Sequence, residues 1–492
     1  MSSYSVINAQ TLANIVATNN TKEQKWVLNV YLESLGKNPF TKFIGGFKGG
    51  KPIIQVADTQ KLHGTTITIH RKAGVGGMGQ QGETARDGQE RKNRFSNWQF
   101  SIGRLWQGLA QNTVARDQTV IGSTFDQDSA KQLAEWLGWR QGLDLETEMI
   151  VSSHSRNTLY PGDASSRESL RSKHYLQSET VTRATNILAT LQAQPLNMAK
   201  SAAGADIMKY LLVGSQFSFA QFKQTSTYTN IVSLAGARGE TNPLFQGGLP
   251  DWNGAYMWEW YIPDHTAYSP VGSAGTPRAI LGTAIADATS AVDILGGGST
   301  EGAALTDAGY FQNFSNSAYM GFEGEKRASS TGTTRYVLIQ NVSGADAGKF
   351  GMYSYTVNNG TKLTMGGRLN SSIAGIANTT LGNVVWDTGI WSGKHTAAHP
   401  QGSLVYECNS YGQPFVKSYM MADEAIMCGY GSIDGKVAMG NRTEWRGPHG
   451  LDYAVGLESV WGSKAIPRVD GLVNGYAVIE SAYSPDGLPN IV

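Results

Sequence analysis

The segment from 65 to 106 restricts the possible folds more than any other part of the chain. "TTITIHRK" at 65–72 and "RFSNWQFSIGRLW" at 94–106 alternate apolar and polar residues, as half-buried strands do. The polar stretch between them, 73–93, has no apolar stripe. A loop this long without core residues is usually functional or disordered. We therefore predict a long hairpin over 51–110 with such a loop at its tip.

The tip of this hairpin carries charges of both signs. They are Glu83, Arg86, Asp87, Glu90 and Arg91. One interpretation is a solvated tip. The other is a patch that meets complementary charges on a neighbouring subunit.

A short amphipathic helix is predicted near the N-terminus. Thr21 and Gln24 fit a capping box, and Gly36 ends the helical pattern. Its apolar stripe is Val27, Leu28, Tyr31, Leu32 and Leu35. A glycine-rich linker follows, so this stripe cannot be buried locally and is expected to dock elsewhere on the chain or on a neighbour.

Two further helices are predicted, over 128–153 and 179–193. The longer one has two apolar stripes and is therefore expected to be covered on two sides. The first stripe is Leu133, Leu137, Leu145 and Met149, and the second is Trp136, Trp139, Leu143 and Ile150. Ser129 and Gln132 fit a capping box at its start.

The composition changes to Gly, Ser, Thr, Asn and Ala between about 275 and 415, which predicts an inserted β-rich domain. Strands are expected within it and on both sides of it, at 210–214, 335–342, 351–357, 362–365, 383–391, 403–408 and 475–483.

The overall composition excludes several classes of protein. The 40 basic and 39 acidic residues nearly cancel, so strong binding to nucleic acid or an acidic membrane is not expected. Only 16% of residues are charged and 59 are glycine, which suits a surface covered by partners. The N-terminus lacks a signal peptide pattern and no apolar window of about 18 residues is present, so we expect an intracellular protein with no membrane span.

Motifs for catalysis or cofactors are weak. The GxGxxG spacing at 74–79 is not followed by a helix pattern, so a loop tip is the better interpretation. His395 and His399 lack a third ligand nearby, and Cys408 and Cys428 are expected to be reduced thiols. We predict no catalytic residue, no cofactor and no metal site.

An aromatic stretch at 242–260, "NPLFQGGLPDWNGAYMWEW", allows two interpretations. Asp251 and Glu259 with nearby tryptophans could form a glycosidase or glycan-binding site. The same tryptophans, Trp252, Trp258 and Trp260, more often fill a core or an interface. A carbohydrate-active enzyme or glycan-binding module is therefore the alternative function.

Three blocks together resemble a known family. They are "GTTITIHRKAGVGGMGQQGETARDGQERKNRFSNWQFSIGRLWQGLA" at 64–110, "KYLLVGSQFSFAQFK…NPLFQGGLPDWNGAYMWEW" at 209–260, and "ADEAIMCGYGS…DYAVGLESVWGSKAIPR…NGYAVIESA" at 422–482. They resemble the tailed-phage major capsid proteins of the HK97 fold, and are similar to the coat proteins of coliphage N-four and crAss-like phages.

This resemblance implies an α+β fold with a defined set of parts. They are an N-terminal arm (1–50), an extended loop (51–112), a peripheral domain (113–208) with a spine helix at 128–153, an axial domain (209–274 and 416–492) and the inserted β-rich domain (275–415). In this arrangement the aromatics of 242–260 pack inward behind a turn at Asn253-Gly254. The insertion departs from the family pattern, and we expect the subunit to tolerate removal of 280–412.

The resemblance also implies a function in assembly without catalysis. The protein would form pentamers and hexamers of an icosahedral shell around double-stranded DNA, in a virion assembled in the host cytoplasm. Portal, scaffolding and auxiliary or decoration proteins are the implied partners. The expected interface residues are Trp26, Leu28 and Leu32 of the arm, with Glu83, Arg86, Asp87, Glu90 and Arg91 of the extended loop.

Overall fold

The structure, a computed structural model, contains two compact units. Residues 1–148 and 423–475 form the first unit, and residues 149–422 and 476–492 form the second. The predicted domain boundaries fall elsewhere and remain a prediction. The residues that the structure describes are 29–34, 38, 40–46, 50–57, 66–72, 95–112, 125–200, 206–226, 228–230, 233, 252–260, 279–280, 335–341, 343–358, 362–368, 399–400, 403–409, 412–433, 436–437, 441–446, 452–467, 473 and 475–483.

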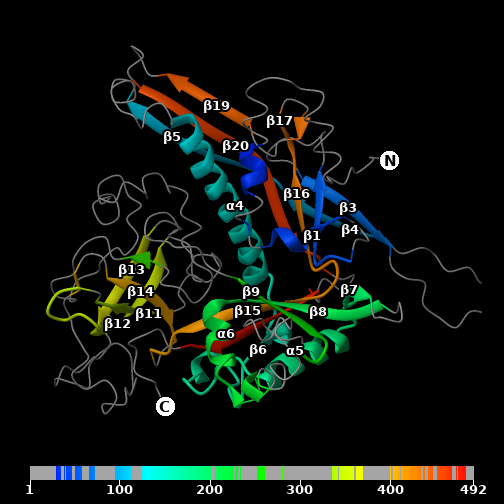
Figure 1. The fold of residues 1–492 in the computed structure, drawn as a ribbon, viewed down its shortest axis with the longest axis vertical. Helices are drawn as coiled ribbons and strands as arrows, with labels where there is room; N and C mark the ends of the chain where they lie inside the picture. The colour runs from blue at the N-terminus through cyan, green and yellow to red at the C-terminus, as the bar shows by residue number, and fades with distance from the viewer. Residues whose placement is uncertain are drawn as a thin grey trace, which may run out of the picture. The chain divides into compact units, whose positions relative to one another are not determined.

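The first unit is built on a mixed sheet of six strands (Figure 1). The strand order is β1-β2-β16-β20-β19, and β5 also pairs with β20. The bounds are β1 (Ile44–Gly45), β2 (Ile53–Ala57), β16 (Ile426–Tyr430), β20 (Asp452–Ala465), β19 (Asn441–Arg446) and β5 (Gly103–Asn112). Two small antiparallel pairs complete the unit: β3 (Thr66–Lys72) with β4 (Phe95–Ser101), and β17 (Ser432–Ile433) with β18 (Lys436–Val437).

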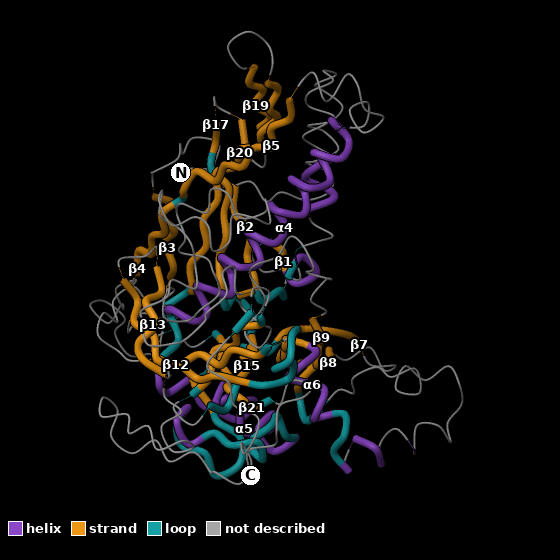
Figure 2. The backbone as a smooth tube through the Cα atoms, turned by 90° about the vertical axis from the view of Figure 1, so that its left-hand side faces the viewer, coloured by secondary structure: helices purple, strands orange, loops and turns teal. Residues whose placement is uncertain are grey.

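Helix α4 (Phe125–Val151) lies along β5 and β20 in Figures 1 and 2. Leu133 and Leu137 on the helix pack with Val455 and Leu457 of β20. All four residues of the first predicted stripe are buried, which confirms that prediction. Of the second stripe, Ile150 is buried and Trp136 is half-buried.

The predicted start of this helix is wrong. The helix begins at Phe125, and Ser129 is buried within it instead of capping it. Asp126 and Asp128 precede Ser129, and carboxylates in a first turn favour the helix N-terminus. A capping-box pattern therefore does not locate the start when the residues before it also favour the helix.

The second unit contains another six-stranded sheet, in the order β6-β21-β15-β8-β7 with β9 paired to β8. The bounds are β6 (Thr158–Leu159), β21 (Tyr476–Ala482), β15 (Phe415–Met421), β8 (Asp206–Ser215), β7 (Leu196–Lys200) and β9 (Ala255–Trp260). Helix α5 (Ser178–Thr190) packs Val181, Ala184 and Leu188 on this sheet, and α6 (Gln216–Phe222) adds Phe219 and Phe222. The predicted helix at 179–193 and the strands at 210–214 and 475–483 are confirmed.

A five-stranded antiparallel sheet lies within 279–408, in the order β10-β14-β11-β12-β13. The bounds are β10 (Ala279–Ile280), β14 (Leu404–Cys408), β11 (Arg335–Gln340), β12 (Phe350–Asn358) and β13 (Lys362–Arg368). The strands predicted at 335–342, 351–357, 362–365 and 403–408 are confirmed, and the one at 383–391 lies outside the described residues.

Candidate assembly interface

The hairpin of β3 and β4 forms a sheet of two strands only. Ile67 pairs with Phe100, and Ile69 pairs with Trp98, so apolar side chains share one face. Thr66 and Gln99 are exposed. A two-stranded hairpin is at best marginally stable by itself in water. Its stability therefore depends on what its base contacts.

The base of the hairpin is packed into the core of the first unit. Ile67 and Phe100 are buried in a cluster whose other members are Ile54, Val56, Ile102, Met427, Val460 and Ile466. Two glycines make this close approach possible. A Cβ on Gly429 would lie 2.9 Å from Phe100 Cζ, and a Cβ on Gly462 would lie 2.4 Å from the carbonyl oxygen of Ser101. The hairpin base is thus fixed where β16 and β20 lack side chains.

The predicted strand at 94–106 is two strands. β4 ends at Ser101, Ile102 is buried between the strands, and β5 begins at Gly103. β5 then pairs with β20 from Gly103↔Trp461 to Asn112↔Asp452. The alternation of apolar residues continues through the break, which is why the pattern alone does not show it.

Trp106 is the most exposed large apolar side chain of the described residues, at 57%. It lies on β5, an edge strand, and its indole Nε1 donates to Thr443 Oγ1 of β19 at 3.4 Å. Gly108 and Gly456 leave room for the ring, because a Cβ on either would lie 3.0 Å from indole atoms. The ring therefore covers the backbone of the three-stranded β5–β20–β19 ribbon and presents its other side to solvent.

The N-terminal helix is helical at 29–34, and its buried face differs from the prediction. Val30 and Tyr31 are buried, whereas Leu32 is 49% exposed. Val30 joins the cluster around Leu133, so the helix docks on its own chain. The prediction placed Leu32 on the same apolar face as Tyr31. In the docked helix Tyr31 is buried and Leu32 lies on the exposed side.

Tyr31 is held by a buried polar network. Its ring meets that of Tyr430 edge-on, with centroids 6.0 Å apart, and the two phenols hydrogen-bond. Gln141 Nε2 of α4 donates to Tyr430 Oη at 2.9 Å. Burial raises the pKa of the Tyr430 phenol well above its usual range. Both phenols therefore stay neutral and act as hydrogen-bonding groups that fix the helix on α4 and β16.

Most of the predicted interface lies outside the described residues. Only Leu32 is described; the others are Trp26, Leu28, Glu83, Arg86, Asp87, Glu90 and Arg91. The GxGxxG stretch at 74–79 lies outside them as well. Trp106 was missed by sequence reasoning, and the signal that could have found it is its place between Gly103 and Gly108 on a strand.

The end of the aromatic stretch forms strand β9, which pairs in parallel with β8, and 242–251 lie outside the described residues. Asn253 and Gly254 have positive φ values of 39° and 80° and form the turn that precedes it. Ala255 and Met257 lie in the core cluster and Trp252 packs against it, so the prediction that the aromatics pack inward is confirmed for Trp252. It is wrong for Tyr256 and Trp258, which are half-buried and lie outside this cluster. The alternation of the strand gives the inward positions to 255 and 257.

The glycan-site alternative receives little support from this stretch. Glu259 forms an ion pair with Lys223 at 2.5 Å, which ties β9 to the end of α6. Asp251 lies outside the described residues. A carboxylate already paired with a lysine has a structural role that accounts for it.

The other sequence candidates are also structural where they are described. His399 is buried, and its Nδ1 lies 2.6 Å from Asn341 Oδ1; His395 lies outside the described residues. Cys408 and Cys428 are buried free thiols, as predicted. Within the described ranges, no three His, Cys, Asp or Glu side chains are grouped so as to hold a metal ion. None of the helices described there is long and apolar enough to cross a membrane.

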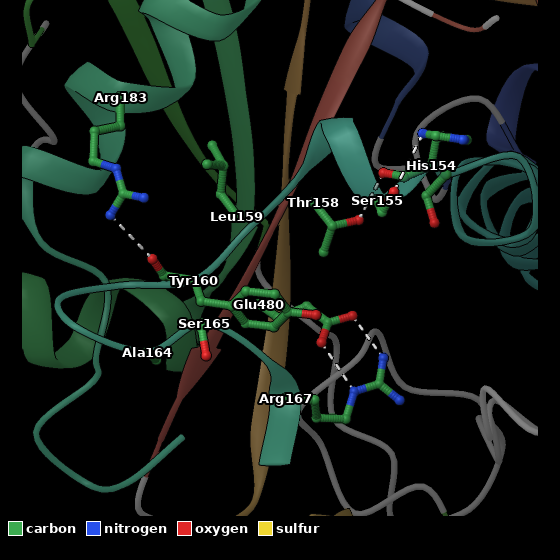
Figure 3. Close-up of a pocket in the computed structure, with 11 residues that line it drawn as sticks. His154, Ser155, Thr158, Leu159, Tyr160, Ala164, Ser165, Arg167, Arg183 and Glu480 are labelled. Carbon is green, nitrogen blue, oxygen red and sulfur yellow. Dashed lines mark hydrogen bonds and ion pairs between the residues drawn. The ribbon is translucent and has the colours of Figure 1, made fainter. Parts of the chain in front are cut away.

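A polar pocket of about 460 Å³ lies in the second unit beside β6 (Figure 3). Its walls come from 153–160, 164–167, Arg183 of α5 and Glu480 of β21. Glu480 is buried and lies opposite Lys417 in the β15–β21 register. Arg167 donates to both Glu480 oxygens, at 2.9 and 2.6 Å, and Lys417 Nζ lies 2.9 Å from Oε1.

This ion cluster explains how Lys417 of β15 and Glu480 of β21 can both be buried, because each charge has a partner of opposite sign. Removing one partner of a buried pair typically costs about 3–5 kcal/mol, because a charge is left unpaired. Arg167 is also placed by Phe415, whose ring centroid lies 4.5 Å below the guanidinium carbon. The cluster therefore anchors the 160–170 loop on β15 and β21.

Comparison with known proteins identifies the fold. It is the HK97-like phage capsid fold, an α+β arrangement, as the sequence predicts. The capsid structure of Ralstonia phage GP4 is similar over 92% of each chain, with a TM-score of 0.50 and 13% identity. The capsid of cyanophage Pam1 aligns over 92% of this chain and 94% of its own, with a TM-score of 0.47 and 11% identity. No protein-family model and no curated protein sequence matches the chain.

Proposed function

We propose that the chain is a major capsid protein that self-assembles into the icosahedral shell of a tailed bacteriophage around double-stranded DNA. The observation that carries this proposal is the shared fold with the Ralstonia phage GP4 capsid over nearly the whole of both chains. The protein then acts by assembly, not by catalysis. Its location is the virion, after assembly in the host cytoplasm.

The hairpin of β3 and β4 supports this proposal independently. It is a two-stranded extension whose base is packed into the first unit, and a two-stranded hairpin is marginally stable by itself, so neighbouring copies would supply contacts for the rest. We assign it as the extended loop of the capsid fold. The first unit, with α4 as the spine helix, is assigned as the peripheral domain, and the sheet around β15 and β21 as the axial domain. This assignment gives 423–475 to the peripheral domain, whereas the resemblance implied an axial domain that includes 416–492.

Exposed apolar side chains fit the same function. Leu32 and Trp106 lie on different elements of the first unit and are exposed in a single chain. Tryptophan is enriched among the residues that dominate binding energy at protein interfaces. Pentamers and hexamers of this chain would cover such residues. Portal, scaffolding and decoration proteins are further proposed partners.

Imaging of the full-length protein tests the proposal. We expect purified protein, expressed alone or with its phage's assembly partners, to sediment as megadalton particles and to show closed shells in negative-stain micrographs. A monodisperse monomer under all these conditions would contradict it. Hydrolysis or binding of a glycan panel that is lost in Glu259→Gln would instead support the carbohydrate-active alternative.

A further inference from the structure

The polar pocket beside β6 has a net positive charge. The charged residues that line it are Arg167, Arg183 and Glu480. Both oxygens of Glu480 already accept from cations, since Lys417 lies beneath it. Arg167 and Lys417 therefore neutralise this carboxylate, and Arg183 adds a further positive charge to the lining. Two exposed acids lie on the wall loop, Asp163 and Glu168, and Asp163 pairs with Lys173 and His174.

Arg183 is an exposed residue that lines the pocket, and among the described residues only its Nη1 acts as a donor. Its Nη1 donates to the carbonyl oxygen of Tyr160 at 3.4 Å (Figure 3) and to that of Gly162 at 3.5 Å. Within the described part of the chain, no carboxylate contacts this guanidinium. A guanidinium has five N–H donors in a planar fork that matches oxyanions. As far as the described residues show, the charged Arg183 guanidinium therefore has donors available for a further acceptor.

Other residues that line the pocket supply further hydrogen-bond donors. His154 Nδ1 accepts from the Arg156 backbone amide at 3.3 Å, so in the neutral ring the proton is on Nε2, which can donate. Hydroxyl groups of Ser155 and Ser165 also line the pocket. A cationic pocket with hydroxyl and imidazole donors suits an anion with several oxygens.

We propose that this pocket binds a compact oxyanion, a carboxylate or phosphate group, with Arg183 as its charged ligand. The volume of about 460 Å³ exceeds that of a single small ion, so the group would enter with water or at the end of a longer molecule. Two sources carry this chemistry: free inorganic phosphate, or an acidic side chain of a second copy of this chain.

Calorimetric titration of full-length subunits with inorganic phosphate, at constant ionic strength, tests the site. We expect saturable binding at one site per chain in the wild type. Arg183→Gln should weaken it at least tenfold. The matched control is Arg171→Gln, because Arg171 also donates to backbone carbonyls on the same loop but does not line the pocket; its binding should equal that of the wild type.

A second variant keeps the test valid if Arg183→Gln does not fold. Ser165→Asp places a carboxylate in the pocket at an exposed position and should abolish phosphate binding. No saturable binding by the wild type, or equal binding by the wild type and Arg183→Gln, would overturn the proposal.

Assembled particles distinguish the two sources, and this arm alone rests on the proposed function. Particles that bind phosphate at one site per chain indicate the free anion. Particles that do not bind it, although subunits do, indicate that a neighbouring copy's carboxylate fills the site. In that case Arg183→Gln particles should dissociate at a lower denaturant concentration. If no particles form, the proposed function fails while the subunit titration still decides the site.

Discussion

At the scale of single residues, glycines decide where backbones meet in the first unit. Gly429 and Gly462 lie in central strands, where glycine is otherwise unfavourable. Each faces the hairpin base at a distance that leaves no space for a methyl group. Glycine at these two positions weakens the strands, but it allows the close approach that fixes the hairpin base.

Replacing Gly429 by alanine tests whether the hairpin base needs this close approach to β16. The added Cβ would lie 2.9 Å from Phe100 Cζ, 3.1 Å from Ile67 Cδ1 and 3.1 Å from the carbonyl oxygen of Val56. We expect a loss of about 1–3 kcal/mol in the free energy of unfolding, the usual cost of overpacking. Urea denaturation measures it. Gly103→Ala is the matched control, because its Cβ meets nothing within 4 Å; equal effects in both variants would contradict the prediction.

A second residue-scale feature is the contact between Asp163 and His174. Asp163 Oδ1 lies 2.5 Å from His174 Nε2, and His174 Nδ1 accepts from the Arg171 amide at 2.9 Å. A neutral ring protonated on Nε2 satisfies both contacts. The hydrogen bond from His174, with Lys173 nearby, lowers the pKa of Asp163 to about 2.

This contact makes the loop sensitive to acid. Since the pKa of Asp163 in the folded chain lies below the unfolded value of 3.8, its stabilising contribution is complete above about pH 4 and disappears as the pH falls towards 2. We expect hydrogen exchange of the peptide 160–177 to increase over this interval. Asp163→Asn should remove this pH dependence, whereas Glu179→Gln, a carboxylate elsewhere in the unit, should retain it.

At the scale of elements, the five-stranded sheet shares a core with the rest of the second unit. Leu338, Phe350 and Tyr406 of the sheet pack with Val416 of β15 and with Tyr483, the residue that follows β21. Asn409 Nδ2 also donates to the carbonyl oxygens of 167 and 170, at 3.1 and 3.0 Å. This sheet is therefore attached by packing as well as by its connections.

The sequence led us to expect that the subunit tolerates removal of 280–412. The shared core leads to the opposite expectation. Removal of 280–412 would expose Val416, Tyr483 and Phe217, and each buried side chain of this size is worth about 1.5–3 kcal/mol. We expect the deletion protein to aggregate. The same deletion with Val416→Thr, Phe217→Ser and Tyr483→Ser should be more soluble, as measured by the soluble fraction and size-exclusion chromatography. A soluble, monodisperse simple deletion would show that the shared core is dispensable.

At the scale of the whole molecule, the chain is proposed to be complete only in an assembly. Obligate interfaces bury about 2,000–5,000 Å² or more and are more apolar than transient ones. The predicted loop at 73–93, with charges of both signs and no apolar stripe, would contribute specificity to such an interface.

Deletion of 76–92 tests this role. We expect a folded subunit, because the hairpin base is packed through residues outside the deletion, and loss of stable shells. Circular dichroism and negative-stain microscopy measure the two properties. Replacing 76–92 by a Gly/Ser sequence of equal length separates lost contacts from a shortened loop and should also prevent stable shells. Normal, equally robust particles from either variant would refute the role.

The sequence determined the elements whose signals are local. The stripe of α4 at Leu133, Leu137, Leu145 and Met149 and the strands of the inserted sheet follow from periodicity, which a chain carries whatever it packs against. The resemblance of the three blocks also led to the correct fold.

Tertiary structure alone decided which surfaces are buried and which strands pair. The break at Ile102, the exposure of Leu32 and Trp106, and the pairing of Lys417 with Glu480 depend on partners distant in the sequence. The polar pocket depends on them too, because Arg183 of α5 and Glu480 of β21 line the same pocket only when both elements are placed on the same sheet. Periodicity fixes which face of an element is apolar, but only packing fixes what that face meets.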